Sequence, residues 1–168
     1  MLMRMQKERR PPVTRRLKIL FLCTGNSCRS QMAEGWARKL KADVLEPYSV
    51  GIEPHGLDPL AVRVMAEAGV DIRAQRSKSV GELRDVPFDA VITVCGHAQE
   101  TCPAWLGRKT TVLHAGFDDP PRLAAGAGTE EEALTHYRRV RDEIRAFVQT
   151  LPGAEMKHAG ATAGRGDG

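Results

Sequence analysis

Four cysteines are the residues of this 168-residue chain that most clearly could carry chemistry: Cys23, Cys28, Cys95 and Cys102. Two disulfides would be typical of a short secreted protein, but the N-terminal segment lacks the apolar run and the small-residue cleavage site of a signal peptide. We therefore expect a reducing, cytosolic location. Thiols there are catalytic, metal-binding or simply buried, and the residues around each one must distinguish these roles.

Cys23 opens a segment that we call the oxyanion loop, residues 23–30, with the sequence Cys-Thr-Gly-Asn-Ser-Cys-Arg-Ser. The loop follows a strand-like apolar run at 17–22 and precedes a helical spacing of apolar residues. A short loop at a helix N-terminus collects main-chain N–H groups that attract an anion. We expect the anion to be bound by Thr24, Gly25, Asn26, Ser27, Cys28, Arg29 and Ser30.

Arg29 adds a planar, two-pronged donor suited to tetrahedral oxyanions. The positive potential of the loop should favour the thiolate form of Cys23. Gly25 allows a tight turn, while Asn26 and Ser30 are expected to hydrogen-bond within the loop, with Ser30 able to donate to the Cys23 sulfur. The structural alternative is a buried thiol next to an exposed arginine.

Alternating strand and helix patterns predict the fold. Strands are expected at 17–22, 44–50, 89–94 and 110–114, and helices from Ser30, over 59–68 and over 129–151. The third strand is almost continuously apolar, which indicates a parallel sheet covered on both faces. We predict a three-layer α/β sandwich with a central four-stranded parallel sheet, formed by residues 17–151.

The two ends of the chain differ in composition from this body. Residues 1–18 carry a local charge of +6 within a total of +4, so the remainder is slightly acidic. Residues 1–16 are predicted to be a flexible basic leader, and residues 152–168 a disordered Gly/Ala-rich tail. The leader lacks interleaved aromatic residues, and no apolar run approaches the ~18 residues of a membrane span, so neither nucleic acid nor a membrane is an expected partner.

From Cys23 to Trp36 the sequence resembles the thioredoxin-coupled arsenate reductases, which share the fold of the low-molecular-weight tyrosine phosphatases. The resemblance covers roughly residues 17–150. It continues, in order, through Tyr48–Glu53, His55-Gly56, Val94–Gly96, Cys102-Pro103, Gly116–Pro120 and Arg139–Ile144.

This resemblance implies arsenate reduction to arsenite, a step of arsenic detoxification. It assigns Cys23 as the nucleophile on arsenate, Arg29 and the loop amides as the oxyanion clamp, and Asp119 as the acid that protonates the departing oxygen. A carboxyl in an Asp-Pro turn after a strand can reach a loop that leaves a neighbouring strand, which favours Asp119 independently. Asp118 is the competing candidate.

The resemblance also implies a relay of three thiols. Cys95 attacks Cys23, arsenite leaves, and Cys102 then attacks Cys95, so that the disulfide moves outward to thioredoxin. Electrons would come from reduced thioredoxin, with no other cofactor, and the enzyme is expected to be a monomer. Cys95 follows a predicted strand at the same sheet edge as Cys23, as this relay requires.

The spacing of Cys95 and Cys102 makes a structural demand. If the residues between them are helical, seven steps of ~1.5 Å separate the cysteines by about 10 Å. A disulfide needs Cα atoms within ~7 Å. We therefore predict that Gly96 to Thr101 rearranges on oxidation. The plainer interpretations are that Cys95 is an inert core thiol and Cys102 a bystander.

Cys28 is expected to be structural, under the loop. Zinc is not expected, because neither cysteine pair has the two-residue spacing of common zinc knuckles. Some reductases of the resembled family hold a potassium ion at positions that correspond here to Asn26, Glu34, Ser49 and, for an aspartate, Lys78. Since an ammonium group stands at that last position, we expect no potassium dependence.

Two other functions compete with arsenate reduction. The first is a low-molecular-weight tyrosine phosphatase, which the loop, Arg29 and Asp119 would also serve. Such phosphatases usually carry aromatic residues after the Asp-Pro pair, where this chain has Pro121 and Arg122, and they do not need Cys95 and Cys102. The second is a non-enzymatic thiol protein that binds metalloid or zinc.

Overall fold

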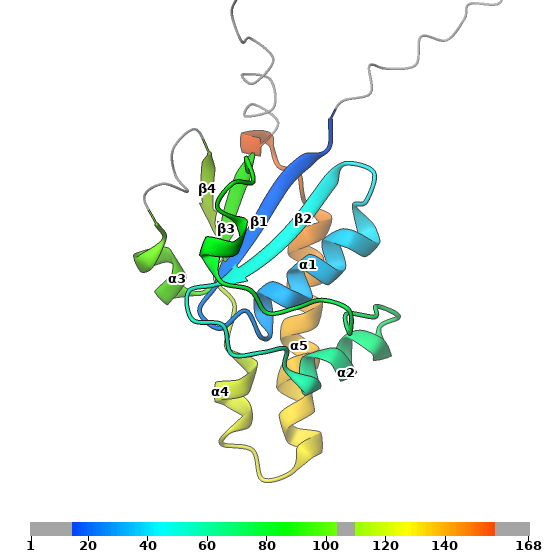
Figure 1. Ribbon diagram of the computed structural model, residues 1–168. Coiled ribbons are helices and arrows are strands. Elements are labelled where there is room, and N and C mark those ends of the chain that lie inside the picture. Colours follow the sequence, from blue (N-terminus) through cyan, green and yellow to red (C-terminus); the bar gives the residue numbers. More distant parts are fainter. Residues whose placement is uncertain (1–14, 104–109, 157–168) are drawn as a thin grey trace, which may run out of the picture.

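The central sheet has four parallel strands in the order β2-β1-β3-β4 (Figure 1). A computed structural model describes residues 15–103 and 110–156. The strands are β1 (Leu17–Cys23), β2 (Leu45–Gly51), β3 (Ala90–Thr93) and β4 (Thr111–His114). The side chains of 19–23 in β1 and all those of β3 are buried, so both faces of the sheet centre are covered. The predicted α/β sandwich is confirmed.

The strand register brings the carboxyl ends of all four strands to one edge. Cys23 pairs with Gly51, Leu22 with Thr93, and Thr93 with His114. In open parallel sheets this edge is where ligands bind. The loops that leave it therefore carry the candidate chemistry.

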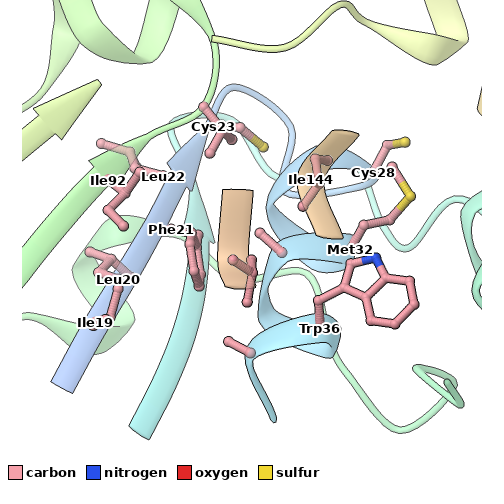
Figure 2. Packing of buried hydrophobic residues seen from close by; sticks show 14 of the residues in the cluster. Ile19, Leu20, Phe21, Leu22, Cys23, Cys28, Met32, Trp36, Ile92 and Ile144 are labelled. Atoms are coloured by element: carbon pink, nitrogen blue, oxygen red, sulfur yellow. The ribbon is translucent and has the colours of Figure 1, made fainter. Parts of the chain in front are cut away.

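Helices α1 (Arg29–Leu40) and α5 (Glu130–Gln149) pack together and supply much of the core. Met32 and Trp36 of α1 and Ile144 of α5 are buried with the β1 side chains (Figure 2). The core thus fixes α1 directly below the oxyanion loop. Burial of a large apolar side chain contributes about 1.5–3 kcal/mol, so this position is firmly held.

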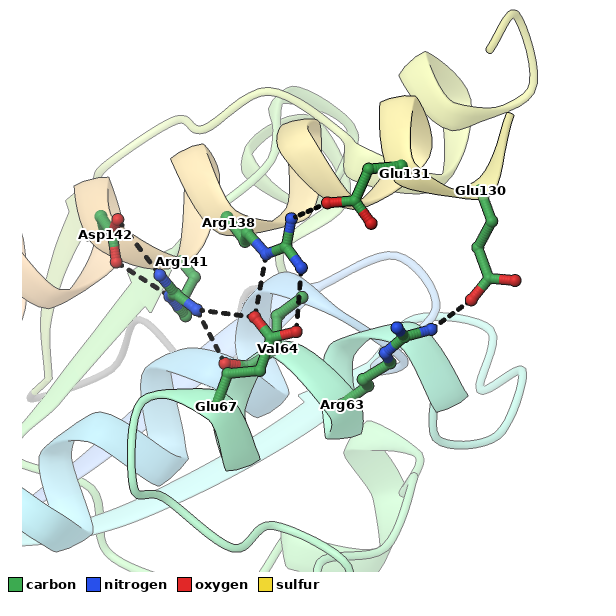
Figure 3. Close-up of polar contacts among 8 residues, drawn as sticks. All are labelled: Arg63, Val64, Glu67, Glu130, Glu131, Arg138, Arg141 and Asp142. Atoms are coloured by element: carbon green, nitrogen blue, oxygen red, sulfur yellow. Dashed lines mark hydrogen bonds and ion pairs between the residues drawn. The ribbon is translucent and has the colours of Figure 1, made fainter. Parts of the chain in front are cut away.

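The remaining helices are α2 (Pro59–Glu67), α3 (Gly96–Thr101), α4 (Pro120–Ala124) and a 3-10 turn, η1 (Val80–Leu83). Helix α2 begins where predicted, with Asp58 accepting a hydrogen bond from the Leu60 main chain. It packs on α5, and ion pairs cross between them, including Arg138 on Glu67 and Arg63 on Glu130 (Figure 3). Exposed pairs of this kind contribute little each.

The observed elements differ from the expected ones mainly at their ends and where they are short. Helix α1 begins at Arg29 rather than Ser30, and β2 extends to Gly51. Sequence patterns did not predict α4 or η1, because elements of four or five residues are too short to show a helical period. Met156 is buried, so the folded body extends past the predicted end at Leu151.

Most of the predicted leader, residues 1–14, and the end of the predicted tail, residues 157–168, lie outside the described residues. Arg15, within the predicted leader, donates two hydrogen bonds to the Asp89 carboxylate. Among the helices that are described, none is both long and apolar enough to cross a membrane.

Candidate active site

The oxyanion loop is held by the segment that follows β2. Four main-chain N–H groups of residues 52–58 donate to four loop carbonyls: Ile52 to Cys23 (3.1 Å), Glu53 to Thr24 (2.8 Å), His55 to Gly25 (2.9 Å) and Asp58 to Ser27 (2.9 Å). In a trans peptide the N–H points opposite to the C=O. The N–H groups that follow these carbonyls therefore point away from residues 52–58, toward one common side.

The Cys23 sulfur lies on that common side. The Asn26 N–H donates to it at 3.2 Å, and the Ser30 Oγ lies 2.8 Å from it. Asn26 adopts a left-handed backbone (φ 46°), and its side-chain Nδ2 donates to Ser30 Oγ at 2.8 Å. The predicted hydrogen bonds of Asn26 and Ser30 within the loop are thus present: the Asn26 N–H donates to the sulfur, and the Ser30 hydroxyl lies within hydrogen-bond distance of it.

Two glycines make this close approach possible. A Cβ on Gly51 would lie 2.8 Å from both the Asn26 nitrogen and the Thr24 carbonyl oxygen, so β2 and the loop can touch only without a side chain there. A Cβ on Gly25 would lie 2.7 Å from the His55 ring. The sequence identified Gly25 as a turn residue; the group that it avoids is a side chain from the segment after β2.

Arg29 connects the loop to the segment before α4. Its Nη1 donates to the Phe117 carbonyl at 3.0 Å, and its Nη2 lies 3.6 Å from Asp119 Oδ1. The Arg29 side chain is 14% exposed and that of Asp119 is 40% exposed. Asp118 instead pairs with Arg139 of α5 at 3.0 Å. Of the two candidate acids, only Asp119 is directed to the guanidinium of the loop.

Cys95 also reaches the loop. It follows β3 and caps the N-terminus of α3, where its sulfur accepts from the Ala98 N–H at 3.4 Å. The same sulfur lies 3.3 Å from the hydroxyl of Thr24, next to Cys23 in the chain. Cys95 is 5% exposed. Each of the two sulfur atoms thus accepts a hydrogen bond from a main-chain N–H, Cys23 from Asn26 and Cys95 from Ala98.

Cys102 lies at the opposite end of α3, directly after its last residue. It is partly exposed, and burial raises the pKa of its thiol above the usual value of 9.0. The residues between Cys95 and Cys102 are helical, so the condition for the predicted rearrangement is met. All four cysteines, each within the described residues, are free thiols.

Cys28 is buried near the base of the loop. Burial, and then the Asp58 carboxylate, raise the pKa of its thiol well above the usual value. Cys28 is therefore a protonated thiol at neutral pH. This environment agrees with the structural role expected from the sequence and opposes a nucleophilic one.

The site expected for potassium in some relatives has different chemistry here. Glu34 is 3% exposed and accepts from Ser49 Oγ at 3.3 Å, and Arg38 lies 3.6 Å from its other oxygen. The Glu34 pKa is raised: burial raises it, and the nearby positive charges of Lys78 and Arg38 offset only part of that rise. The chain itself thus supplies positive charge near Glu34, which opposes the binding of a further cation there. Within residues 15–103 and 110–156, no three His, Cys, Asp or Glu side chains gather closely enough to hold a metal ion.

Comparison with known proteins places this arrangement in a family. The model of the low molecular weight phosphotyrosine protein phosphatases matches residues 18–160. The chain belongs to that family. Within it, the arsenate reductase of Halalkalibacterium halodurans is 51% identical over 133 residues, which are 79% of this chain and 93% of that protein. The arsenate reductase of Bacillus subtilis is 50% identical over 126 residues, 75% of this chain and 88% of that protein.

Solved structures of this phosphatase family have the same fold. One described as an arsenate reductase in the phosphate binding state matches with a TM-score of 0.65 and 31% identity, over 80% of this chain and 95% of that chain. The arsenate reductase from Archaeoglobus fulgidus matches with a TM-score of 0.60 and 28% identity, over 79% and 97%. The resemblance predicted from the sequence is confirmed.

Sequence reasoning missed several residues that shape the phosphatase-family loop. The segment 52–58 acts through its main chain, which leaves no signal in side-chain types. Gln31 and Gln75, which hydrogen-bond behind the loop, resemble ordinary polar helix and turn residues. The available signal for Gln31 was its position on the face of the predicted helix that packs on the core, where a glutamine is unusual.

Proposed function

We propose that the protein reduces arsenate to arsenite with a relay of three thiols and reduced thioredoxin. The supporting observation is the 3.3 Å contact between the Cys95 sulfur and Thr24, because it brings a second thiol to the loop that carries Cys23. Relatives whose sequences are about 50% identical to this chain are named arsenate reductase, which agrees with arsenate as the substrate. One chain supplies every residue of the relay, so we propose a monomer, acting in the reducing cytosol.

In the first step the oxyanion loop and Arg29 bind arsenate. The Cys23 thiolate attacks arsenic and forms a sulfur–arsenic bond, while one oxygen leaves as water with a proton from Asp119. Arg29 fits this role since its guanidinium lies between the loop and Asp119. The arsenic is still pentavalent at this stage.

In the second step the Cys95 thiolate attacks the Cys23 sulfur. A disulfide forms, the electron pair of the sulfur–arsenic bond remains on arsenic, and trivalent arsenite leaves. Cys102 then loses its proton and attacks Cys95, which frees Cys23 as a thiolate and leaves a Cys95–Cys102 disulfide. A thioredoxin dithiol reduces this disulfide by the same exchange chemistry and is itself oxidised.

The relay is tested by arsenate-dependent NADPH oxidation with thioredoxin and thioredoxin reductase. Cys23→Ser, Cys95→Ser and Cys102→Ser should each abolish turnover. Cys28→Ser is the matched control and should retain most of it, because Cys28 is a buried, protonated thiol. Full activity of Cys102→Ser would indicate another thiol donor, such as a glutaredoxin or a small thiol.

Phosphatase activity is the second candidate function, favoured by the family match and by the pairing of Arg29 with Asp119. A plain phosphatase would lose phosphate-ester hydrolysis with Cys23→Ser and keep it with Cys95→Ser and Cys102→Ser. Absence of arsenate turnover together with this hydrolysis pattern would replace the reductase proposal. A non-enzymatic metalloid binder would show stoichiometric binding and no turnover.

A further inference from the structure

Gln31 is a fully buried polar residue of α1 that lies behind the oxyanion loop. Its side-chain Nε2 lies 3.0 Å from the Asn26 carbonyl oxygen, 3.1 Å from Asn26 Oδ1 and 3.1 Å from the Arg76 carbonyl oxygen, so its two hydrogens are shared among three acceptors. The Gln75 side chain in turn donates to the Gln31 carbonyl and to Gln31 Oε1, both at 2.9 Å. A buried amide with this many partners holds one orientation.

Main-chain partners fix the direction of each amide. Carbonyl oxygens only accept, so the nitrogens of Gln31 and Gln75 must face the carbonyls of Asn26, Arg76 and Gln31. Asn26 Oδ1 accepts from the Lys78 N–H at 2.8 Å, which turns the Asn26 nitrogen toward Ser30. The usual ambiguity between amide oxygen and nitrogen is therefore resolved at all three side chains.

These hydrogen bonds form one series, the chain of amides, in which each group donates to the next one and the last group lies beside the Cys23 sulfur. Gln75 donates to Gln31, Gln31 to Asn26, and Asn26 to Ser30, at 2.9, 3.1 and 2.8 Å. Because Ser30 Oγ already accepts from Asn26, its hydrogen is available for the Cys23 sulfur 2.8 Å away. Hydrogen bonds aligned head to tail polarise one another, most strongly where water is excluded.

We propose that Gln31 is a positioning residue that raises the thiolate fraction of Cys23 through Asn26 and Ser30. It does so in two ways. First, it binds both oxygens of Asn26, whose left-handed backbone directs an N–H to the sulfur. Second, it links the Gln75 donor to Asn26, so that the polarisation of the hydrogen bonds continues from Gln75 to Ser30. The inference deepens the proposed function, since it rests on Cys23 as the nucleophile.

Other titratable and charged side chains also lie around the loop. They are Cys28 and Arg29 at the start of α1, His55 and Asp58 after β2, Lys78 before η1, Cys95 before α3 and Asp119 before α4. None of them belongs to the chain of amides. Removing the Gln31 donor therefore leaves their charges in place and isolates the contribution of the chain.

The test is the pH profile of Cys23 alkylation by iodoacetamide, measured in a background of Cys28→Ala, Cys95→Ser and Cys102→Ser so that Cys23 is the remaining thiol. Gln31→Met keeps the length of the side chain and removes its donors and acceptor. The midpoint of the profile should move up by roughly 0.5 to 1 pH unit. Thr93→Val is the control: it removes a buried hydroxyl bound to Leu113 and His114, outside the chain, and should leave the midpoint unchanged.

An unchanged midpoint in a folded Gln31→Met protein would overturn the proposal, as would an equal shift in Thr93→Val. If Gln31→Met does not fold, Gln75→Met removes the first donor at a less buried position and should shift the midpoint in the same direction. No shift there contradicts the proposal as well. The readout does not use arsenate, so a shift in a protein that fails to reduce arsenate would refute the proposed function and leave this inference standing.

Discussion

The Cys95 sulfur lies 3.3 Å from the hydroxyl of Thr24, although the two residues are 71 positions apart in the sequence. Parallel pairing of β1 with β3 produces this contact, because Leu22 and Thr93 are register partners and both chains turn away at the same edge. A second thiol therefore lies beside the oxyanion loop that carries Cys23.

Helix α3 should unwind when Cys95 and Cys102 form a disulfide. The two cysteines flank its six residues, and a helical path of about 10 Å exceeds the ~7 Å that a disulfide allows. Amide hydrogen exchange of Gly96 to Thr101 should become faster in the oxidised protein than in the reduced one. Helix α4, short and without cysteine, is the matched control and should not change. Equal protection of α3 in both states would contradict the relay.

Asp119→Asn should lower kcat for arsenate by about 10²- to 10⁴-fold, the usual contribution of a general acid. Its carboxylate lies 3.6 Å from the Arg29 guanidinium. Asp118→Asn is the matched control, since Asp118 pairs with Arg139 on the protein surface, and it should change kcat less than about threefold. Steady-state rates of both variants decide the assignment. A larger loss in Asp118→Asn would reverse it.

Exchange of potassium for sodium should leave the rate of arsenate turnover nearly unchanged. Glu34 is the buried carboxylate at the position that corresponds to a potassium ligand in some reductases of the resembled family. It has the Arg38 guanidinium at 3.6 Å, and the positive charge of Lys78 also acts on it. The rate is measured in matched potassium and sodium buffers of equal ionic strength. A several-fold loss in sodium would show that a cation acts there after all.

Glu34 should make the protein less stable as pH rises. Burial raises its pKa above 4.5, so the folded protein binds this proton more tightly than the unfolded chain does. The stabilisation from protonation is full below the unfolded-state pKa and is lost as pH rises through the folded-state pKa. The free energy of unfolding of the wild type should therefore fall relative to Glu34→Gln as pH rises above the ordinary glutamate pKa of about 4.3.

Glu82 provides the control of opposite sign. The Ser79 main chain and Arg76 lower the pKa of this exposed carboxylate, so its stabilisation is present above the unfolded-state pKa and is lost as pH falls. Urea titrations of the wild type, Glu34→Gln and Glu82→Gln measure both effects. A pH dependence of Glu34→Gln identical to that of the wild type would show that the Glu34 pKa is unshifted.

The parts of the site predicted from the sequence are those that local patterns encode. Cys23 ends a buried strand and Arg29 and Ser30 begin an amphipathic helix, and this context alone predicts an anion loop. The hydrogen bonds from residues 52–58 and the chain through Gln31 could not be predicted. They depend on tertiary contacts of main-chain groups and amides, for which many residue types look equally suitable.

The convergence of the thiols is tested most directly by one turnover without a reductant. The reduced protein is mixed with arsenate in the absence of thioredoxin, and the disulfides are mapped by peptide mass spectrometry. The wild type should release about one arsenite per chain and hold a Cys95–Cys102 disulfide, and Cys102→Ser should stop with Cys23 joined to Cys95. Four free thiols and unchanged arsenate would contradict the account.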